Sequence, residues 1–244
     1  MQNSIKVVNL KKTYGTKEAV KNINFEIKEN EIIGLLGPNG SGKTTTIGMI
    51  LGLLKPTSGE VLINGLKIEK NPIEILQKIN FISPYIELPK KLTVKQNLIV
   101  YGKLYDIKDL KTKIEYLSEK LRLGDIINKI TGELSSGQKN RVSLAKSIIN
   151  DPLVLLLDEP TASLDPETGD FVRSFFENYQ KEKGTSILLA SHNMSEVERL
   201  CSSVLMMNNG SIIDQGSTGK LIQKHGRRNM EEVFLKLTRN NDEF

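Results

Sequence analysis

Cysteine, histidine and tryptophan are scarce in this sequence of 244 residues, which holds one cysteine, two histidines and no tryptophan. A single cysteine, Cys201, excludes an internal disulfide and any metal cage built from several thiolates, and it fits a reducing cytoplasm. The two histidines, His192 and His225, are too few for a histidine-rich metal site. Metal sites built from several cysteines or histidines are therefore excluded, as is an internal disulfide.

Long apolar runs are missing too. No segment approaches the roughly 20 apolar residues that a helix needs to cross a bilayer, and the start of the chain does not resemble a signal peptide. The longest candidates, such as Leu153–Leu157, are short enough to be buried strands. We therefore expect a soluble chain, with any membrane role supplied by a partner.

Basic stripes with interleaved aromatics, which are typical of nucleic-acid binding, are absent as well. Aromatic residues make up 5% of the chain, and the net charge of +5 comes mainly from lysines spread along its whole length. Scattered, solvated lysines explain this charge better than a concentrated binding surface. No nucleic-acid partner is expected.

Apolar periodicity predicts a single α/β domain over residues 1–244. A hairpin signal at Asn64-Gly65 and alternating runs before it predict antiparallel strands near the N-terminus. After residue 150, short apolar runs alternate with helical stretches, which predicts a mainly parallel sheet covered by helices. The expected parts are an α/β core (1–86 and 151–216), a helical insert (87–150) and a short C-terminal helical tail (217–244).

Two helical segments show their buried face in the sequence. The insert has apolar residues at helical spacing, and in the tail Asn229 is the expected N-cap of a helix that carries Glu232 at its third position. The apolar positions are Leu110, Ile114, Leu117 and Leu121 in the insert, and Met230, Val233, Phe234 and Leu237 in the tail.

A glycine-rich segment between a predicted strand and a predicted helix matches the pattern G-x-x-x-x-G-K-[ST]. Its glycines let the backbone close around a phosphate, and successive N–H groups at the start of the helix form an anion site. We assign Lys43 to the β- and γ-phosphates of ATP and the Thr44 hydroxyl to Mg²⁺. An ordinary glycine-rich turn is the alternative, which this context disfavours. The residues expected to bind ATP are Gly37, Pro38, Asn39, Gly40, Ser41, Gly42, Lys43, Thr44 and Thr45.

Two acids, Asp158 and Glu159, follow the buried-strand pattern of Leu153–Leu157. Acids at the carboxyl end of a parallel strand lie at the sheet edge where ligands bind. Asp158 is suited to hold Mg²⁺, directly or through water, and Glu159 to act on the attacking water as a catalytic base or by orienting it. Taken alone, the pair could simply begin a polar loop. Together with the upstream loop it predicts a P-loop NTPase core with a mainly parallel sheet.

Four further segments resemble the ABC ATPase family, and the order and spacing of all these motifs match it over essentially the whole chain. Leu134–Gln138, with the sequence LSSGQ, resembles the family signature LSGGQ. Thr161–Asp165 resembles the D-loop, Ser191-His192 the switch histidine, and Tyr14 the aromatic that stacks on adenine. Each has a simpler interpretation when taken alone: a helix-capping turn, a structural histidine, or a half-buried tyrosine at a strand end.

This resemblance implies a mechanism that needs two ATPase domains. A second copy of the chain, or a paralogous ATPase, would pair with it head to tail and sandwich ATP, and Asp165 would link the two sites. An integral-membrane permease would convert the closing and opening of the dimer into transport. The implied contacts with the γ-phosphate come from the catalytic His192 and, across the dimer, from Ser135, Ser136, Gly137 and Gln138.

Two positions depart from the family pattern. Ser136 stands where the signature has a second glycine, and serine tolerates most backbone conformations. The family also has a glutamine between the core and the insert, which contacts Mg²⁺ and the membrane subunit. That position falls at about Pro84, within Ser83-Pro84-Tyr85, so the sequence leaves open what replaces the glutamine.

The single ATPase domain and the ending Asn229–Leu235 resemble the ATPase subunits of type-2 ABC exporters. This resemblance implies export and a peripheral position on the inner face of a bacterial cell membrane. A soluble ABC-type ATPase that acts on ribosomes or DNA is one alternative, although such proteins usually carry two ATPase domains or long coiled-coil insertions. A regulatory ATPase with weak turnover is the other, and the missing glutamine keeps it open.

Overall fold

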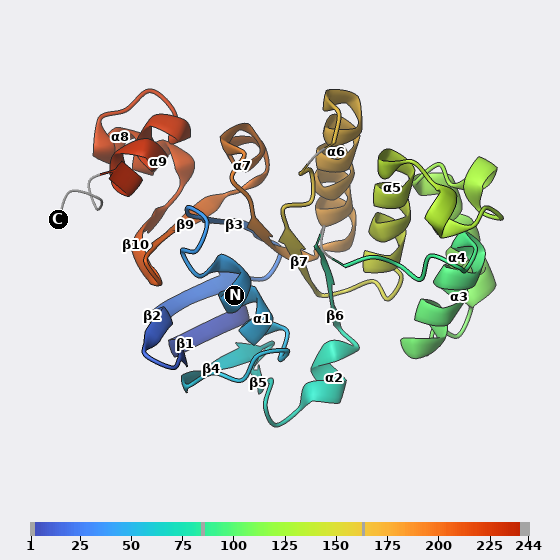
Figure 1. The fold of residues 1–244 in the computed structure, drawn as a ribbon, viewed down its shortest axis with the longest axis horizontal. Helices are drawn as coiled ribbons and strands as arrows, with labels where there is room; N and C mark the ends of the chain where they lie inside the picture. Colours follow the sequence, from blue (N-terminus) through green and yellow to red (C-terminus); the bar gives the residue numbers. More distant parts are fainter. Residues whose placement is uncertain (1–2, 84–85, 163, 240–244) are drawn as a thin grey trace.

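The computed structural model describes residues 3–83, 86–162 and 164–239 of the chain. Two β-sheets lie one above the other, and helices cover the outer face of the larger sheet (Figure 1). The smaller sheet has the strand order β2-β1-β4-β5 and the larger one the order β10-β9-β3-β8-β7-β6. The α/β fold class predicted from the sequence is confirmed.

The smaller sheet is antiparallel and contains the N-terminal strands. The turn at Asn64-Gly65 joins β4 to β5 as predicted, with φ angles of 47° and 78°. Positive φ at both positions is what a type I′ hairpin turn requires. The strands of this sheet are β1 (Asn3–Tyr14), β2 (Lys17–Lys28), β4 (Ser58–Ile63) and β5 (Leu66–Lys67).

The larger sheet is parallel apart from the pairing of β10 with β9. In β7, Leu155 and Leu157 pack on the helical side, whereas Val154 and Leu156 pack toward the antiparallel sheet. Burial on both faces explains the unbroken apolar run in the sequence. The strands are β3 (Ile32–Leu36), β6 (Ile79–Ile82), β7 (Val154–Asp158), β8 (Ser186–Ala190), β9 (Ser203–Asn208) and β10 (Ser211–Gly216).

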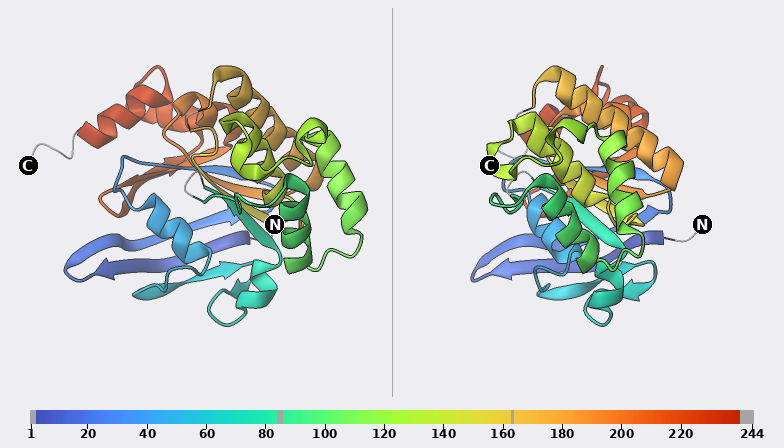
Figure 2. Two further views of the ribbon diagram at one scale, coloured as in Figure 1. Left: turned by 45° about the vertical axis from the view of Figure 1, so that its right-hand side comes forward. Right: turned by 90° about the vertical axis from the view of Figure 1, so that its right-hand side faces the viewer.

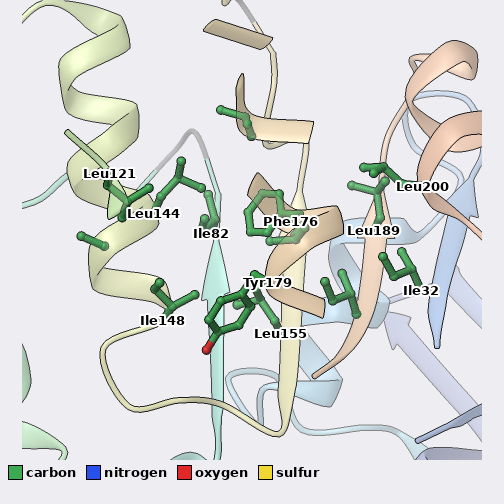
Figure 3. Close-up of a cluster of buried hydrophobic side chains, with 14 of the residues drawn as sticks. Ile32, Ile82, Leu121, Leu144, Ile148, Leu155, Phe176, Tyr179, Leu189 and Leu200 are labelled. Carbon is green, nitrogen blue, oxygen red and sulfur yellow. The ribbon is translucent and has the colours of Figure 1, made fainter. Parts of the chain in front are cut away.

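Each face of the larger sheet carries its own apolar core. Helix α1 (Lys43–Ile50) contributes to the core between the two sheets. On the opposite face, Phe176 and Tyr179 pack among residues of the sheet and of the neighbouring helices (Figure 3). Full burial of one such large apolar side chain contributes about 1.5–3 kcal/mol. The helices on this face are α5 (Ser136–Ser147), α6 (Pro166–Lys183) and α7 (Met194–Leu200).

The segment between β6 and β7 is helical, and its predicted apolar face is confirmed: Ile114, Leu117 and Leu121 are buried, and Leu110 packs against them. This segment and the C-terminal helices lie at opposite ends of the molecule (Figure 2). The remaining helices are α2 (Pro72–Leu76), α3 (Val94–Leu104), α4 (Leu110–Lys120), α8 (Thr218–His225) and α9 (Met230–Arg239).

The C-terminal helix α9 begins as predicted. The Asn229 side chain accepts a hydrogen bond from the Glu232 N–H at 2.9 Å. The Glu232 carboxylate accepts from the N–H of Arg228, one residue before the cap. Met230 and Val233 are fully buried. Across the residues that the structure describes, no helix combines the length and the apolar character that a membrane crossing requires.

Lys146 of α5 joins the helical insert to the core. Its Nζ donates to Asn80 Oδ1 at 3.0 Å and to the Phe81 carbonyl at 3.3 Å, and it lies 4.9 Å from the centroid of the Phe81 ring. Burial lowers the pKa of Lys146 to about 8. An unfolded lysine has a pKa of about 10.4, so between these two values the unfolded chain binds more protons than the folded chain.

We predict that the free energy of unfolding rises, relative to that of a Lys146→Met variant, as the pH increases from about 8 to about 10. The cost of burying the charged ammonium is largest below this range and disappears as Lys146 loses its proton. Denaturant unfolding of both proteins at a series of pH values measures the difference. Lys103→Met, at an exposed position of α3, is the control. A difference that stays constant over this pH range would contradict the prediction.

Candidate active site

A cleft at the carboxyl ends of the parallel strands collects most of the predicted site residues. Its volume of about 1370 Å³ is ample for a nucleotide. Its walls come from the β1–β2 hairpin, the β3–α1 loop, the segments after β7 and β8, and the β9–β10 turn. The predicted residues that line it are Tyr14, Gly37, Pro38, Asn39, Gly40, Gly42, Lys43, Thr44, Thr45, Asp158, Glu159 and His192.

Close backbone contacts require glycine at two positions of the β3–α1 loop. A Cβ atom on Gly37 would lie 2.4 Å from the carbonyl oxygen of Met207. Gly42 has a φ of 107°, and its Cβ would lie 2.7 Å from the carbonyl oxygen of Ala19. Residues with a side chain rarely adopt such a φ, and a Cβ atom cannot lie this close to a carbonyl oxygen. The loop therefore lies directly against the backbones of β9 and β2, in a conformation that can surround a phosphate.

Lys43 begins α1 and folds its side chain back onto the same loop. Its Nζ donates to the carbonyl of Gly37 at 2.7 Å and to that of Pro38 at 3.2 Å, and the residue is 8% exposed. Burial lowers the pKa of Lys43, and the carboxylates of Glu159 and Asp158 oppose this shift. A phosphate is a stronger acceptor for an ammonium than these carbonyls, so the loop offers the lysine to an incoming anion.

Asp158 ends β7 and is 5% exposed. Burial and the adjacent Glu159 raise the pKa of Asp158, while Lys43 lowers it. Its carboxylate shares the cleft with Thr44. Carboxylate and hydroxyl oxygens are the hard ligands that Mg²⁺ prefers, and a buried acid with a raised pKa gains from a nearby cation. The two residues assigned to Mg²⁺ therefore fit that ion in their chemistry.

Glu159 and His192 are in direct contact. The Nδ1 atom of His192 lies 2.7 Å from Oε2 of Glu159, with the histidine side chain 69% exposed and the glutamate side chain 17% exposed. Glu159 has a positive φ of 53°, and its N–H donates to the Ala190 carbonyl at 2.8 Å. A left-handed backbone is uncommon for glutamate and persists only where neighbouring structure holds it. The loop geometry thus aims this carboxylate at the histidine and into the cleft.

The signature segment does not line the cleft. Ser135 caps α5 with a reciprocal pair of hydrogen bonds: its hydroxyl accepts from the Gln138 N–H at 3.3 Å, and Gln138 Oε1 accepts from the Ser135 N–H at 3.0 Å. Ser135 and Ser136 are exposed, and Gly137 is partly so. The signature therefore presents the start of α5 to the outside of this chain.

Asp165 does not line the cleft either. It is exposed and caps α6, accepting from the Thr168 N–H at 2.9 Å and from the Thr168 hydroxyl at 2.7 Å. These hydrogen bonds hold the pKa of Asp165 below its usual range. Pro84, where the family glutamine was sought, and Tyr85 lie outside the described residues.

Sequence reasoning missed three features of the site. The N–H of Gly210 donates to the Ser41 carbonyl at 3.0 Å, and Phe234 of α9 reaches the cleft. Glu196 is buried beneath the loops that carry Glu159 and His192. Each depends on contacts between distant segments, and Glu196 looks in the sequence like an ordinary acid in the first turn of a helix.

A glycine-rich loop that can surround a phosphate, its buried lysine, and an acid in contact with a histidine define the site of a P-loop ATPase. The chain belongs to the ATP-binding proteins of ABC transporters, which hydrolyse ATP: the family model described as "ABC transporter" matches residues 20–162. Among curated relatives, the ABC transporter ATP-binding protein NatA of Bacillus subtilis (strain 168) is 35% identical over 221 residues, or 89% of each chain. The bacitracin transport ATP-binding protein BcrA of Bacillus licheniformis is 37% identical over 88% of this chain and 70% of its own.

Solved structures give the same result. An ATP-binding subunit of an ABC transporter superposes with a TM-score of 0.88 at 26% identity, covering 96% of this chain and 98% of the other. A dimeric ATP-binding cassette in a post-hydrolysis state, bound to ADP and phosphate, superposes with a TM-score of 0.80 at 27% identity. The alignment covers 87% of this chain and 98% of the cassette.

We predict that Lys43→Ala weakens MgATP binding by about 100-fold or more, because two charge-assisted hydrogen bonds to phosphate are lost. Titration of a fluorescent ATP analogue measures the affinity. Lys21→Ala removes a positive charge from the edge of the same cleft without touching the loop, and it should change the affinity by less than about threefold. Equal losses in the two variants would refute the role of Lys43.

Proposed function

We propose that this chain powers export of a substrate through a separate membrane permease, and that it hydrolyses ATP in a dimer closed by two nucleotides. The observation that carries the proposal is the division of the site. The loop, the two acids and His192 line one cleft, whereas the signature and Asp165 face outward. A second ATPase domain that brings its own signature to this cleft completes the site.

The chain's own groups supply the chemistry of hydrolysis. The backbone N–H groups of the β3–α1 loop and Lys43 hold the phosphates, and Tyr14, 49% exposed at the edge of the cleft, offers its ring to adenine. Glu159 orients the attacking water and accepts its proton, while His192 contacts the γ-phosphate. Mg²⁺ held by Thr44 and Asp158 would neutralise charge on the phosphates.

The exposed start of α5 supports the dimer. An α-helix carries partial positive charge and free N–H groups at its N-terminus, and both favour a phosphate. The start of α5 does not line the cleft that contains the β3–α1 loop and Lys43, so it would bind the γ-phosphate held by a second ATPase domain. Closure around ATP brings the two together, and hydrolysis removes the contacts that favour the closed state. The dimeric cassette with ADP and phosphate is consistent with this arrangement.

An apolar groove supports a permease partner. Its floor and rim come from the end of α1, from α2, from β6 and from the end of α3. Four of its apolar side chains are unusually exposed: Leu53 (67%), Ile73 (74%), Leu76 (41%) and Leu104 (70%). Contiguous exposed apolar surface marks an interaction site. We assign the groove to a cytoplasmic segment of the permease, which would hold the chain against the inner face of the cell membrane.

The direction of transport is proposed from the relatives. One is named for bacitracin transport and others for Nod factor export. The similarity extends over 88% and 95% of this chain for the two examples. We therefore propose export, with the substrate chosen by the permease.

We predict that Glu159→Gln preserves MgATP binding but slows hydrolysis by about 100-fold or more, since the amide cannot accept a proton. Dimers should accumulate with MgATP because the γ-phosphate is not removed. Phosphate release and light scattering measure the two effects. Glu167→Gln, at an exposed position of α6, is the control and should do neither. A Glu159→Gln variant that stays monomeric at saturating MgATP would refute the sandwich.

We predict that Leu104→Glu abolishes binding of the permease without reducing MgATP binding. A charge placed in an apolar interface loses its hydration without gaining a partner. Tagged protein is recovered from detergent-solubilised membranes, and polytopic proteins in the eluate are identified. Leu235→Glu changes an exposed leucine of α9, far from the groove, and should recover the permease as the unchanged chain does. Recovery of ribosomes in place of a permease would favour the soluble alternative.

A further inference from the structure

Glu196 is an acid that is almost completely buried. It lies in the first turn of α7 and is 1% exposed; among the described residues, the only other acid classed as buried is Asp158. Burying a carboxylate is costly unless it is fully hydrogen-bonded. Asp158 has a place in the ATP site, whereas Glu196 does not line the cleft. The position of Glu196 therefore needs another explanation.

The two carboxylate oxygens of Glu196 bind two different loops. Oε2 accepts a hydrogen bond from the Ser191 hydroxyl at 2.6 Å, and Oε1 accepts one from the Thr161 hydroxyl at 3.0 Å. The Ser191 hydroxyl in turn accepts from the N–H of Asn193 at 3.1 Å, so its proton is free to point at Glu196. Thr161 belongs to the loop after β7, and Ser191 to the loop after β8.

These are the loops that carry the two groups in contact inside the cleft. Thr161 lies two residues after Glu159, and Ser191 lies directly before His192. Beyond the backbone hydrogen bond from Glu159 to Ala190, side chains join the loops at two places: at the surface through the 2.7 Å contact of His192 with Glu159, and underneath through Glu196. Side-chain contacts at two different depths restrict the relative orientation of the loops more than either contact would alone.

Helix capping does not explain the carboxylate. The cap of α7 is Asn193, whose side chain accepts from the Glu196 N–H at 3.2 Å. The Glu196 backbone thus takes part in the cap, while its side chain points to the loops. Burial raises the pKa of Glu196, and the hydroxyls of Ser191 and Thr161, together with Arg173, lower it. The surroundings thus compensate part of the burial cost.

We propose that Glu196 is a positioning residue that locks the loops bearing Glu159 and His192 into one unit for hydrolysis. It acts through those residues and does not itself line the cleft. The inference rests on the proposed roles of Glu159 and His192. It adds a residue beneath the cleft on which their relative placement depends.

The first test measures the loops in the full chain without nucleotide. In Glu196→Gln the side chain keeps its shape, but the amide nitrogen cannot accept, so one hydroxyl loses its partner. Hydrogen exchange of residues 159–162, 164–165 and 191–196 should quicken by about tenfold, with the other described segments unchanged. Arg199→Ala is the matched control in the same helix: it removes a 2.6 Å contact with Asp170 that lies outside these loops. It should leave both segments as they are.

The second test measures turnover with MgATP well below the unfolding temperature of each variant. Glu196→Gln should lower kcat by about tenfold while the KM for ATP changes less than about threefold. In a His192→Ala background the same substitution should have little further effect, because the placement of His192 relative to Glu159 no longer matters once the imidazole is removed. Arg199→Ala should retain normal turnover.

Three results would overturn the proposal: unchanged exchange in both loops, faster exchange throughout the chain with a matching loss of stability, or a full additional loss of kcat in the His192→Ala background. Absence of MgATP hydrolysis by the unchanged chain would instead refute the proposed function. The exchange measurement needs no nucleotide, so it still decides whether Glu196 holds the two loops together.

Discussion

Charge in the nucleotide cleft is the constraint on which the rest of the structure depends. In the proposed site a triphosphate would be held by backbone N–H groups and one buried ammonium, next to two acids. The β3–α1 loop can do this because Gly37 and Gly42 let it lie against the backbones of β9 and β2. The parallel sheet then delivers Asp158 and Glu159 to the same edge. Lys43 is held between loop carbonyls and these carboxylates, which keeps its ammonium near the position that a phosphate requires.

The same constraint supports the proposal that one chain supplies only half of each complete ATP site. Its cleft supplies the loop, the acids and the histidine, but the capped helix start at Ser135 faces away. Two such chains arranged head to tail would each provide what the other lacks. The apolar groove between α1, α2 and α3 lies on another part of the surface, so the proposed dimer closure and the proposed permease contact would not compete for the same residues.

Much of the fold and of the candidate site was predictable from the sequence because the informative patterns are local. The phosphate loop, the acids at the end of β7 and the capping residue Asn229 each lie within a few residues of the structure they determine. The alternation of apolar runs predicted the parallel sheet, since β7 is buried on both faces. The contacts of Glu196 and the hydrogen bond from Gly210 to Ser41 could not be predicted, because they join segments that meet only after the sheet has formed. The apolar groove could not be predicted for the same reason, because Leu53 and Leu104 are far apart in the sequence.

The most direct test of the two-chain site is a cross-link between its halves. Asn39 of the loop and Ser136 of the signature are both exposed, and each is replaced by cysteine in a Cys201→Ala background. A short thiol-reactive cross-linker is added with and without MgATP, using Glu159→Gln to slow hydrolysis. The account predicts covalent dimers joined between residues 39 and 136 of different chains, formed only with MgATP. Cross-links that form equally without nucleotide, or only within one chain, would contradict it.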